Sequence, residues 1–285
     1  MWVAHVRFPV GLVARPGGGV LYGERLTGEI REVAPDGTQA KTALSAVAVA
    51  GAETDQRGLL GLARSQDGRL FASWTRPGDG RVVVGQVHRS GAPRLLWIGP
   101  ESADRANGGS LALLPDGRLL IGVGDLLEDR SLADDPTVPN RKILTLDPDG
   151  ASTQIPTVLS VGWNNPYAVT VAADGVPWVA DNSGGRAPER IGRADRPAAD
   201  AVPFPRTKSP IAPAGLVELG RARLGVCGYV SQALTEVVIR QGRPQPTGRV
   251  IVEPCSLGAV VRPDGRIVTA TLHALHLSRT AVLGR

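Results

Sequence analysis

Two residues near the end of the chain could together do acid–base or nucleophilic chemistry. Cys255 stands before the apolar segment 258–272, and His273 directly follows it. If this segment folds as two antiparallel strands, both residues lie at one end of it, where a Cys–His pair could form a thiolate or transfer a proton. A buried cysteine and a rim histidine that have no catalytic role would give the same sequence pattern. Cys255 and His273 are therefore candidate catalytic residues.

Carboxylate, amide and guanidinium side chains form a second candidate group. Such groups suit sugar hydroxyls, carbonyls and carboxylates, because they offer several hydrogen bonds in fixed directions. Asp125 is a third candidate catalytic residue, since its carboxylate could accept a proton. Trp74 could stack on a ligand ring or pack in the core. The polar candidates for binding a ligand are Gln56, Arg57, Arg105, Asn107, Asn164, Asn165 and Asp181.

A hairpin pattern that recurs six times explains how these residues could meet. Each copy is an apolar run, a turn rich in Gly or Asp-Gly, and a second apolar run, which is typical of a β-hairpin. The copies recur every 44 to 58 residues, close to the length of a four-stranded propeller blade. The turn centres are Gly18, Asp67, Asp116, Asp174, Gly220 and Asp264.

The repeats predict an all-β fold, a six-bladed β-propeller with about four antiparallel strands per blade. Residues 1–285 then form a single domain. The apolar run 2–8 has no hairpin before it, so we expect it to supply the outer strand of the last blade and to remove a free sheet edge. Two insertions, 126–140 and 196–213, are long enough to be functional, mobile or simply solvated.

The propeller places the candidate residues on one rim of the central channel. The first strand of each blade lines the channel and the second returns, so residues before the first and after the second share a face. All the candidates named above stand at such positions. This mouth is therefore the predicted small-molecule site.

Composition excludes several other partners. The net charge of +5 comes from arginines scattered along the chain, without the clustered basic face of a nucleic-acid-binding protein. No apolar run reaches the roughly 18 residues of a membrane span. Two cysteines as free thiols fit a reducing, cytoplasmic location, although one bridge between them or a secreted mature form with its leader removed also fits. The oligomeric state stays open.

Several longer phrases resemble a known family. They are QRGLLGLA at 56–63, the stretch GGSLALLPDGRLLIGVGD at 108–125, RKILTLDPDG at 141–150 and GWNNPYAVTVAADGVPWVADN at 162–182. In this order they resemble the soluble quinoprotein glucose/sorbosone dehydrogenases. The resemblance implies a six-bladed propeller that oxidises sugars with pyrroloquinoline quinone (PQQ) and calcium.

The resemblance also implies site residues, and the chain departs from some of them. Gln56 and Asn165 match polar active-site positions. The place of the catalytic histidine is Ala106, and the place of an arginine that faces the quinone is Asn164. Alanine cannot accept a proton, so the scaffold is kept while the base is missing.

Three hypotheses follow for the mouth. A divergent oxidoreductase of a sugar or polyol, with Asp125 or His273 as substitute base, is favoured. A cofactor-free lyase, isomerase, cyclase or hydrolase could instead use the Cys255–His273 pair. A propeller that binds a ligand without chemistry is the third.

Overall fold

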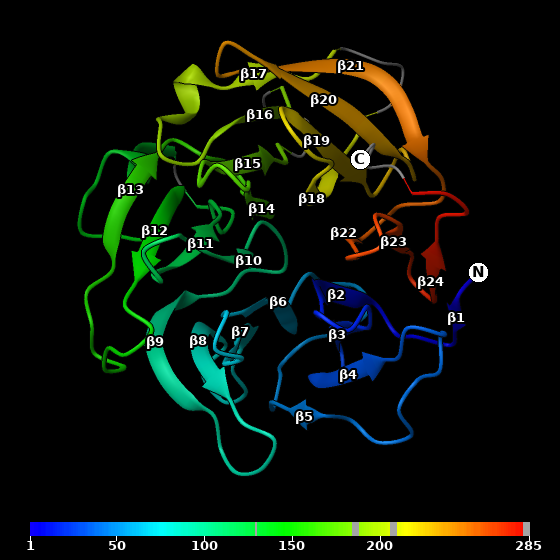
Figure 1. The fold of residues 1–285 in the computed structure, drawn as a ribbon. Helices are drawn as coiled ribbons and strands as arrows, with labels where there is room; N and C mark the ends of the chain where they lie inside the picture. Colours follow the sequence, from blue (N-terminus) through cyan, green and yellow to red (C-terminus); the bar gives the residue numbers. More distant parts are fainter. Residues whose placement is uncertain (129, 184–187, 206–209, 282–285) are drawn as a thin grey trace.

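The computed structural model confirms the six-bladed β-propeller. It describes residues 1–128, 130–183, 188–205 and 210–281. In this part of the chain, six four-stranded antiparallel sheets form a ring around a central channel (Figure 1). The first strand of each blade lies innermost, as predicted.

The first three blades follow the chain in order. Blade one holds β2 (Pro9–Ala14), β3 (Val20–Glu24), β4 (Glu29–Val33) and β5 (Ser45–Ala46). Blade two holds β6 (Leu59–Arg64), β7 (Leu70–Thr75), β8 (Arg81–Val87) and β9 (Arg94–Glu101). Blade three holds β10 (Gly108–Leu113), β11 (Leu119–Val123), β12 (Lys142–Leu146) and β13 (Thr157–Val161).

The last three blades complete the ring. Blade four holds β14 (Ala168–Val171), β15 (Pro177–Asp181), β16 (Arg190–Arg193) and β17 (Val202–Pro203). Blade five holds β18 (Pro213–Glu218), β19 (Arg223–Gly228), β20 (Leu234–Arg240) and β21 (Arg243–Val252). Blade six holds β22 (Gly258–Val261), β23 (Ile267–Ala270), β24 (Ala274–Leu277) and the N-terminal β1 (Val3–Ala4).

The N-terminal strand closes the ring. Val3 pairs with Leu275 and Ala4 with Ala274 in antiparallel register, so β1 covers the edge of β24 (Figure 1). This confirms the expectation for segment 2–8. The pairing removes an exposed edge and joins the two ends of the chain.

The repeated Asp-Gly turns have a shared physical cause. Asp116 Oδ1 accepts a hydrogen bond from Arg118 N at 3.0 Å, and Gly117 between them has a φ of 86°. Only glycine adopts this left-handed conformation readily, and the aspartate replaces a missing backbone partner. Asp67, Asp174 and Asp264 make the same bond in their turns.

Trp74 belongs to the core between blades one and two. It is 3% exposed and packs in one cluster with Leu59, Leu62 and Val83 of blade two and with Val10 of blade one. The prediction that Trp74 contacts a ligand is wrong, because its ring points between the blades rather than toward the mouth.

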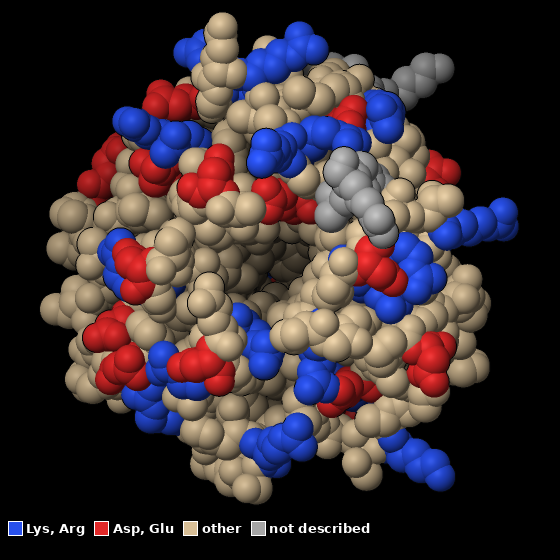
Figure 2. Space-filling model, viewed as in Figure 1, with Lys and Arg blue, Asp and Glu red and all other residues tan. Residues whose placement is uncertain are grey.

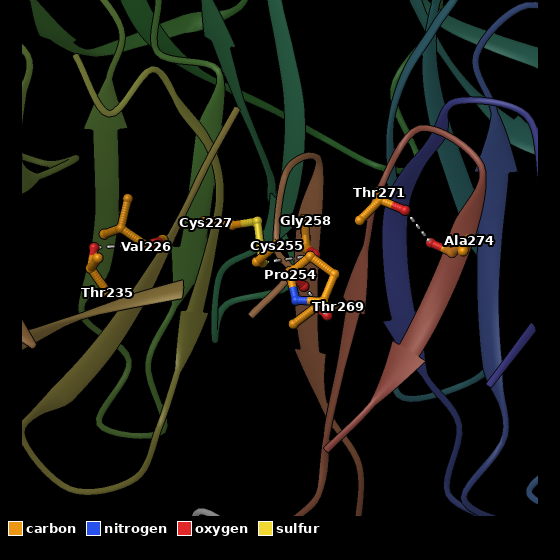
Figure 3. Close-up of a disulfide and its surroundings, with 9 residues drawn as sticks. All are labelled: Val226, Cys227, Thr235, Pro254, Cys255, Gly258, Thr269, Thr271 and Ala274. Carbon is orange, nitrogen blue, oxygen red and sulfur yellow. Dashed lines mark hydrogen bonds between the residues drawn. A yellow bond between two sulfur atoms is a disulfide. The ribbon is translucent and has the colours of Figure 1, made fainter. Parts of the chain in front are cut away.

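The two cysteines form a disulfide instead of free thiols. Cys227 of β19 is bonded to Cys255, which precedes β22, so the bridge joins blades five and six (Figure 3). A bridged sulfur carries no thiolate, and His273 lies exposed against the edge of Phe8, with the ring centroids 6.1 Å apart. The hypothesis of a Cys255–His273 catalytic pair is therefore wrong.

The two insertions are partly built into the fold. Segment 126–140 contains a 3₁₀ turn at Arg130–Ala133. The buried Lys142 ties it down by donating to the carbonyls of Leu132 and Asn140 at 2.9 and 3.1 Å, and burial lowers the pKa of this amine. Segment 196–213 supplies a second 3₁₀ turn and β17, the outer strand of blade four; residues 206–209 lie outside the described part. No helix in the described ranges has the length and apolarity that crossing a membrane requires.

The disulfide predicts a measurable loss of stability when it is removed. We expect Cys227→Ala/Cys255→Ala to lower the free energy of unfolding by about 2–4 kcal/mol, because the bridge restrains the unfolded chain. Urea denaturation measures the change. Reductant should destabilise the wild type and leave the double variant unchanged; equal midpoints for both proteins without reductant would contradict the structural role.

Candidate ligand site at the channel mouth

The channel offers little space between the innermost strands. The innermost strands leave a gap of about 80 Å³. Neighbouring inner strands pack closely side by side: a Cβ on Gly61 would lie 2.6 Å from Gly109 O, and one on Gly215 would lie 2.5 Å from Gly258 Cα. The larger space for a ligand lies at the mouth of the channel.

A cavity of about 220 Å³ opens at the predicted mouth. All the blades, with the loops that precede or follow their strands, contribute to its wall. The wall combines aromatic and small apolar side chains with polar groups, as ligand sites do. The polar and aromatic residues that line it are Phe8, Arg25, Glu53, Thr54, Asp55, Gln56, Arg105, Asn165, Tyr167, Asn182 and Tyr229.

The charges around the molecule do not form a field of one sign. Figure 2 shows one face of the ring with a hollow centre and with basic and acidic side chains intermixed around it. Within the mouth cavity, Arg25 and Arg105 are matched by Glu53 and Asp55. This balance suits a neutral polar ligand better than a strongly charged one.

Two amides in the wall are held in a defined orientation by backbone donors. Gln56 Oε1 accepts a hydrogen bond from Ala106 N at 2.9 Å, and Asn165 Oδ1 accepts one from Gly108 N at 3.0 Å. Because the oxygens are occupied by N–H groups, the NH₂ groups remain for a ligand. Gln56, Asn165 and Arg105 are the sequence-predicted residues that the structure brings to the cavity.

Asp181 and Asn164 position Asn165 rather than line the cavity themselves. The fully buried Asp181 carboxylate accepts hydrogen bonds from the N–H of Asn164 at 2.9 Å, from that of Asn165 at 2.7 Å, and from Arg190 Nε at 2.9 Å. Burial raises the pKa of Asp181, while Arg190 and the two N–H donors oppose this shift. The Asn164 amide donates to Asn182 O at 3.0 Å.

Two other predicted residues stabilise loops outside the described lining. Asn107 is buried, and its amide bonds the N–H and the carbonyl of Ala103 at 2.8 Å each. Arg57 donates to Ser102 Oγ at 3.1 Å and lies 3.3 Å from a carboxylate oxygen of Asp104. Both side chains therefore make their polar contacts with neighbouring loop residues, and neither is among the described residues that line the cavity.

Asp125 is also turned away from the cavity. Its Oδ1 accepts a hydrogen bond from Leu127 N at 3.0 Å, and its Oδ2 lies 3.7 Å from Arg141 Nη1. The carboxylate is buried, at 2% exposed. Neither Asp125 nor the exposed His273 is among the described residues that line the cavity, so neither faces a bound substrate as a substitute base.

Arg25 is the main wall residue that the sequence did not single out as a binding residue. It is 6% exposed and stacks over the Phe8 ring, with 4.6 Å to the centroid. Its Nη1 donates to the carbonyls of Ala52, Asp55 and Arg57 at 3.2, 2.5 and 2.9 Å. Arg25 therefore clamps the loop 52–57 over the cavity, and its Nε and Nη2 make no bond within the described ranges.

Tyr167 adds a phenol to the floor of the cavity. Burial raises the pKa of Tyr167, and the nearby Arg25 opposes this shift. The phenol is therefore protonated at neutral pH and can donate a hydrogen bond. Tyr167 follows the Asn164-Asn165-Pro166 step directly, so its position in the phrase GWNNPY was the signal that could have revealed it.

A comparison with known families decides the relationship of the chain. Residues 6–187 match the sequence profile of the glucose/sorbosone dehydrogenases. The chain belongs to the glucose/sorbosone dehydrogenase family. A comparison with curated proteins gave no match.

Several solved structures share the fold. The chain is similar to the PQQ-bound aldose sugar dehydrogenase of Streptomyces coelicolor, with a TM-score of 0.76, 20% identity, and coverage of 97% of this chain and 96% of that one. It is also similar to the soluble aldose sugar dehydrogenase of Escherichia coli, with a TM-score of 0.77, 18% identity, and coverage of 98% of this chain and 97% of that one. For a gluconolactonase of Xanthomonas campestris, the TM-score is 0.64 and the identity 14%, with coverage of 97% of this chain and 87% of that one. At these identities the likeness concerns the fold.

The structure also shows the surroundings of Ala106, the position that the resemblance assigns to the catalytic histidine. Ala106 has a φ of 60°, and its N–H is bonded to Gln56 Oε1. The backbone at this position is therefore fixed against the cavity wall, but the side chain is a methyl group. A proton acceptor is missing there.

The described residues do not fit the quinone and calcium that the family implies. Calcium takes about 6–8 oxygen ligands, yet the described residues contain no group of three acidic, histidine or cysteine side chains that could hold a metal. The cavity of about 220 Å³ is also smaller than the roughly 300–1,000 Å³ typical of sites for drug-sized ligands, and PQQ is a tricyclic tricarboxylate. We therefore derive no step through either group.

Removal of the Arg25 clamp should loosen the loop over the cavity. We expect Arg25→Ala to lower the free energy of unfolding by about 1–3 kcal/mol, because three carbonyls lose a charged donor. Limited proteolysis should then cut within residues 52–57. Arg221→Ala, which removes an exposed arginine without described partners, is the matched control; equal cleavage of both variants would rule out the clamp.

Proposed function

We propose that this chain binds a small polyhydroxylated ligand, such as a monosaccharide or a polyol, in the mouth cavity. We further propose that it lacks the histidine-dependent hydride abstraction of its family. The observation that supports the proposal is the pair of cavity amides, Gln56 and Asn165, whose oxygens are held by the backbone N–H groups of Ala106 and Gly108.

The composition of the wall supports this class of ligand. The amide NH₂ groups, the Tyr167 phenol and Arg25 offer donors, and the carboxylates of Glu53 and Asp55 offer acceptors. Sugar hydroxyls both donate and accept, so they can satisfy such a mixed set. Phe8 and Tyr229 add aromatic surface, which suits the apolar face of a sugar ring. The size of the cavity favours a single ring.

The locked amides provide a sharp test of the site. Asn165→Asp and Gln56→Glu each keep the oxygen that accepts the backbone N–H and remove the NH₂ donor. We expect each to weaken the affinity for the best-binding aldose or polyol by about tenfold in isothermal titration, while the thermal midpoint stays near that of the wild type. Arg221→Ala is the control and should bind like the wild type.

Three outcomes would contradict this proposal. The first is that no aldose or polyol binds, and the second is that both amide variants bind as tightly as the wild type. The third is dye reduction by the wild type with an aldose in the presence of PQQ and calcium, which would require a base other than the missing histidine.

A second candidate function is a cofactor-free proton transfer, such as the hydrolysis of a lactone or an elimination. Glu53 favours it, because this exposed carboxylate lines the cavity and makes no hydrogen bond or ion pair with the described residues. A free carboxylate beside a bound ligand can act as a general base.

Glu53→Gln separates the two functions. If Glu53 is a base, we expect kcat for an aldonolactone to fall by about 100-fold or more while KM changes little. The ligand affinity measured by titration should also be kept. Absence of turnover by the wild type, or unchanged kcat in the variant, would eliminate this candidate.

The disulfide also bears on where the chain works. Bridges persist in oxidising environments and are rare in reducing ones. The Cys227–Cys255 bridge therefore supports an oxidising compartment rather than the cytoplasm, and we propose that location.

A further inference from the structure

A second cavity lies at the opposite end of the strands from the mouth. It has a volume of about 410 Å³ and sits between blades one and two. Arg15 directly follows β2, Arg64 ends β6, Arg69 directly precedes β7, and Arg89 stands just after β8. Strand ends of two neighbouring blades thus bring four arginines to one groove.

The charge in this groove is strongly unbalanced. Its lining contains four arginines and His88, but a single acidic residue, Asp67. Arg69 is neutralised, since its guanidinium lies 2.9 Å from Asp67 and 2.7 Å from Asp149. Arg15 is paired with Glu32.

Three basic side chains of the groove have no acidic partner. They are Arg64, Arg89 and the ring of His88. Their side chains make no hydrogen bond or ion pair with any described residue, although they line the same groove as the two paired arginines. Like charges gathered in one groove repel each other, and an anion between them relieves this cost. The planar guanidinium groups match the two oxygens of a carboxylate or phosphate.

The floor of the groove is apolar. Leu21, Leu70 and Val87 form it and are 3%, 8% and 6% exposed, with Leu44 beside them. A hydrated inorganic ion would gain nothing from such a floor, whereas an apolar body would bury surface there. The groove therefore combines an anion-binding wall with a hydrophobic base.

We propose that this groove binds a small organic oxyanion, a phosphate ester or a carboxylate, that carries an apolar body. The site is separate from the mouth and does not rest on the function proposed for it. The unpaired Arg64 and Arg89 would hold the oxyanion, and the apolar body would lie on Leu21, Leu70 and Val87.

Titrations with four probes test the proposal on the full chain. The probes are phenyl phosphate, benzoate, inorganic phosphate and benzyl alcohol. We expect phenyl phosphate or benzoate to bind saturably, more tightly than inorganic phosphate, and more weakly as salt rises. Benzyl alcohol, which lacks the charge, should not bind. Which of the two aromatic anions binds more tightly identifies the oxyanion.

Variants locate the binding. Arg64→Ala/Arg89→Ala should weaken the affinity by about tenfold or more, because two charged donors are lost. Arg240→Ala/Arg243→Ala, on the exposed hairpin of blade five, is the control and should bind like the wild type. If the double variant fails to fold, Arg89→Glu replaces it, because Arg89 is exposed. We expect this single variant to lose a similar amount of affinity.

Several results would overturn the proposal. They are no saturable binding of either aromatic anion, an unchanged affinity in the Arg64 and Arg89 variants, inorganic phosphate binding as tightly as phenyl phosphate, or binding of benzyl alcohol.

Discussion

Backbone N–H groups that are buried just before the inner strands need hydrogen-bond partners. At the mouth, side-chain oxygens of the same or a neighbouring blade accept these hydrogen bonds. Gly108, at the start of β10, donates to the Asn165 amide of the next blade, and Asp181 holds the N–H groups of Asn164 and Asn165. Ala106 donates to Gln56 of the previous blade. The same bonds that join blades two, three and four also set which face of each amide a ligand meets.

The same arrangement bears on Ala106, the position that the family resemblance assigns to the catalytic histidine. The methyl group of Ala106 plays no part in these bonds, whereas its N–H does. A side chain at this position can therefore change without disturbing the amides. The bonds that set the cavity wall and the side chain at this position are therefore physically separable.

The fold could be predicted because its signals are local. An Asp-Gly turn is set by a few residues, such as Asp116 and Gly117. Four of the six hairpins have such a turn and the other two turn at a glycine, so the sixfold repeat was visible along the chain. The rim positions were also predictable, since alternating strand directions fix them. Which rim side chains face the cavity was not predictable. Asn107 and Asp125 turn back onto their own loops, and this depends on where the backbone leaves a donor unpaired.

Contacts between segments that are distant in the sequence could not be predicted either. The bridge between Cys227 and Cys255 depends on how blades five and six pack, and the Arg25 clamp depends on the path of loop 52–57. Trp74 stands at a rim position but packs between blades one and two. Each case reflects the orientation of a side chain in the assembled ring, about which the sequence of a single hairpin says little.

The most direct test of the central claim is a crystal structure of this chain soaked with the aldose or polyol that binds it best. The account predicts electron density for a single sugar ring in the mouth cavity, within hydrogen-bond distance of Gln56 Nε2 and Asn165 Nδ2. Density for the sugar elsewhere on the ring, with this cavity holding only solvent, would contradict it.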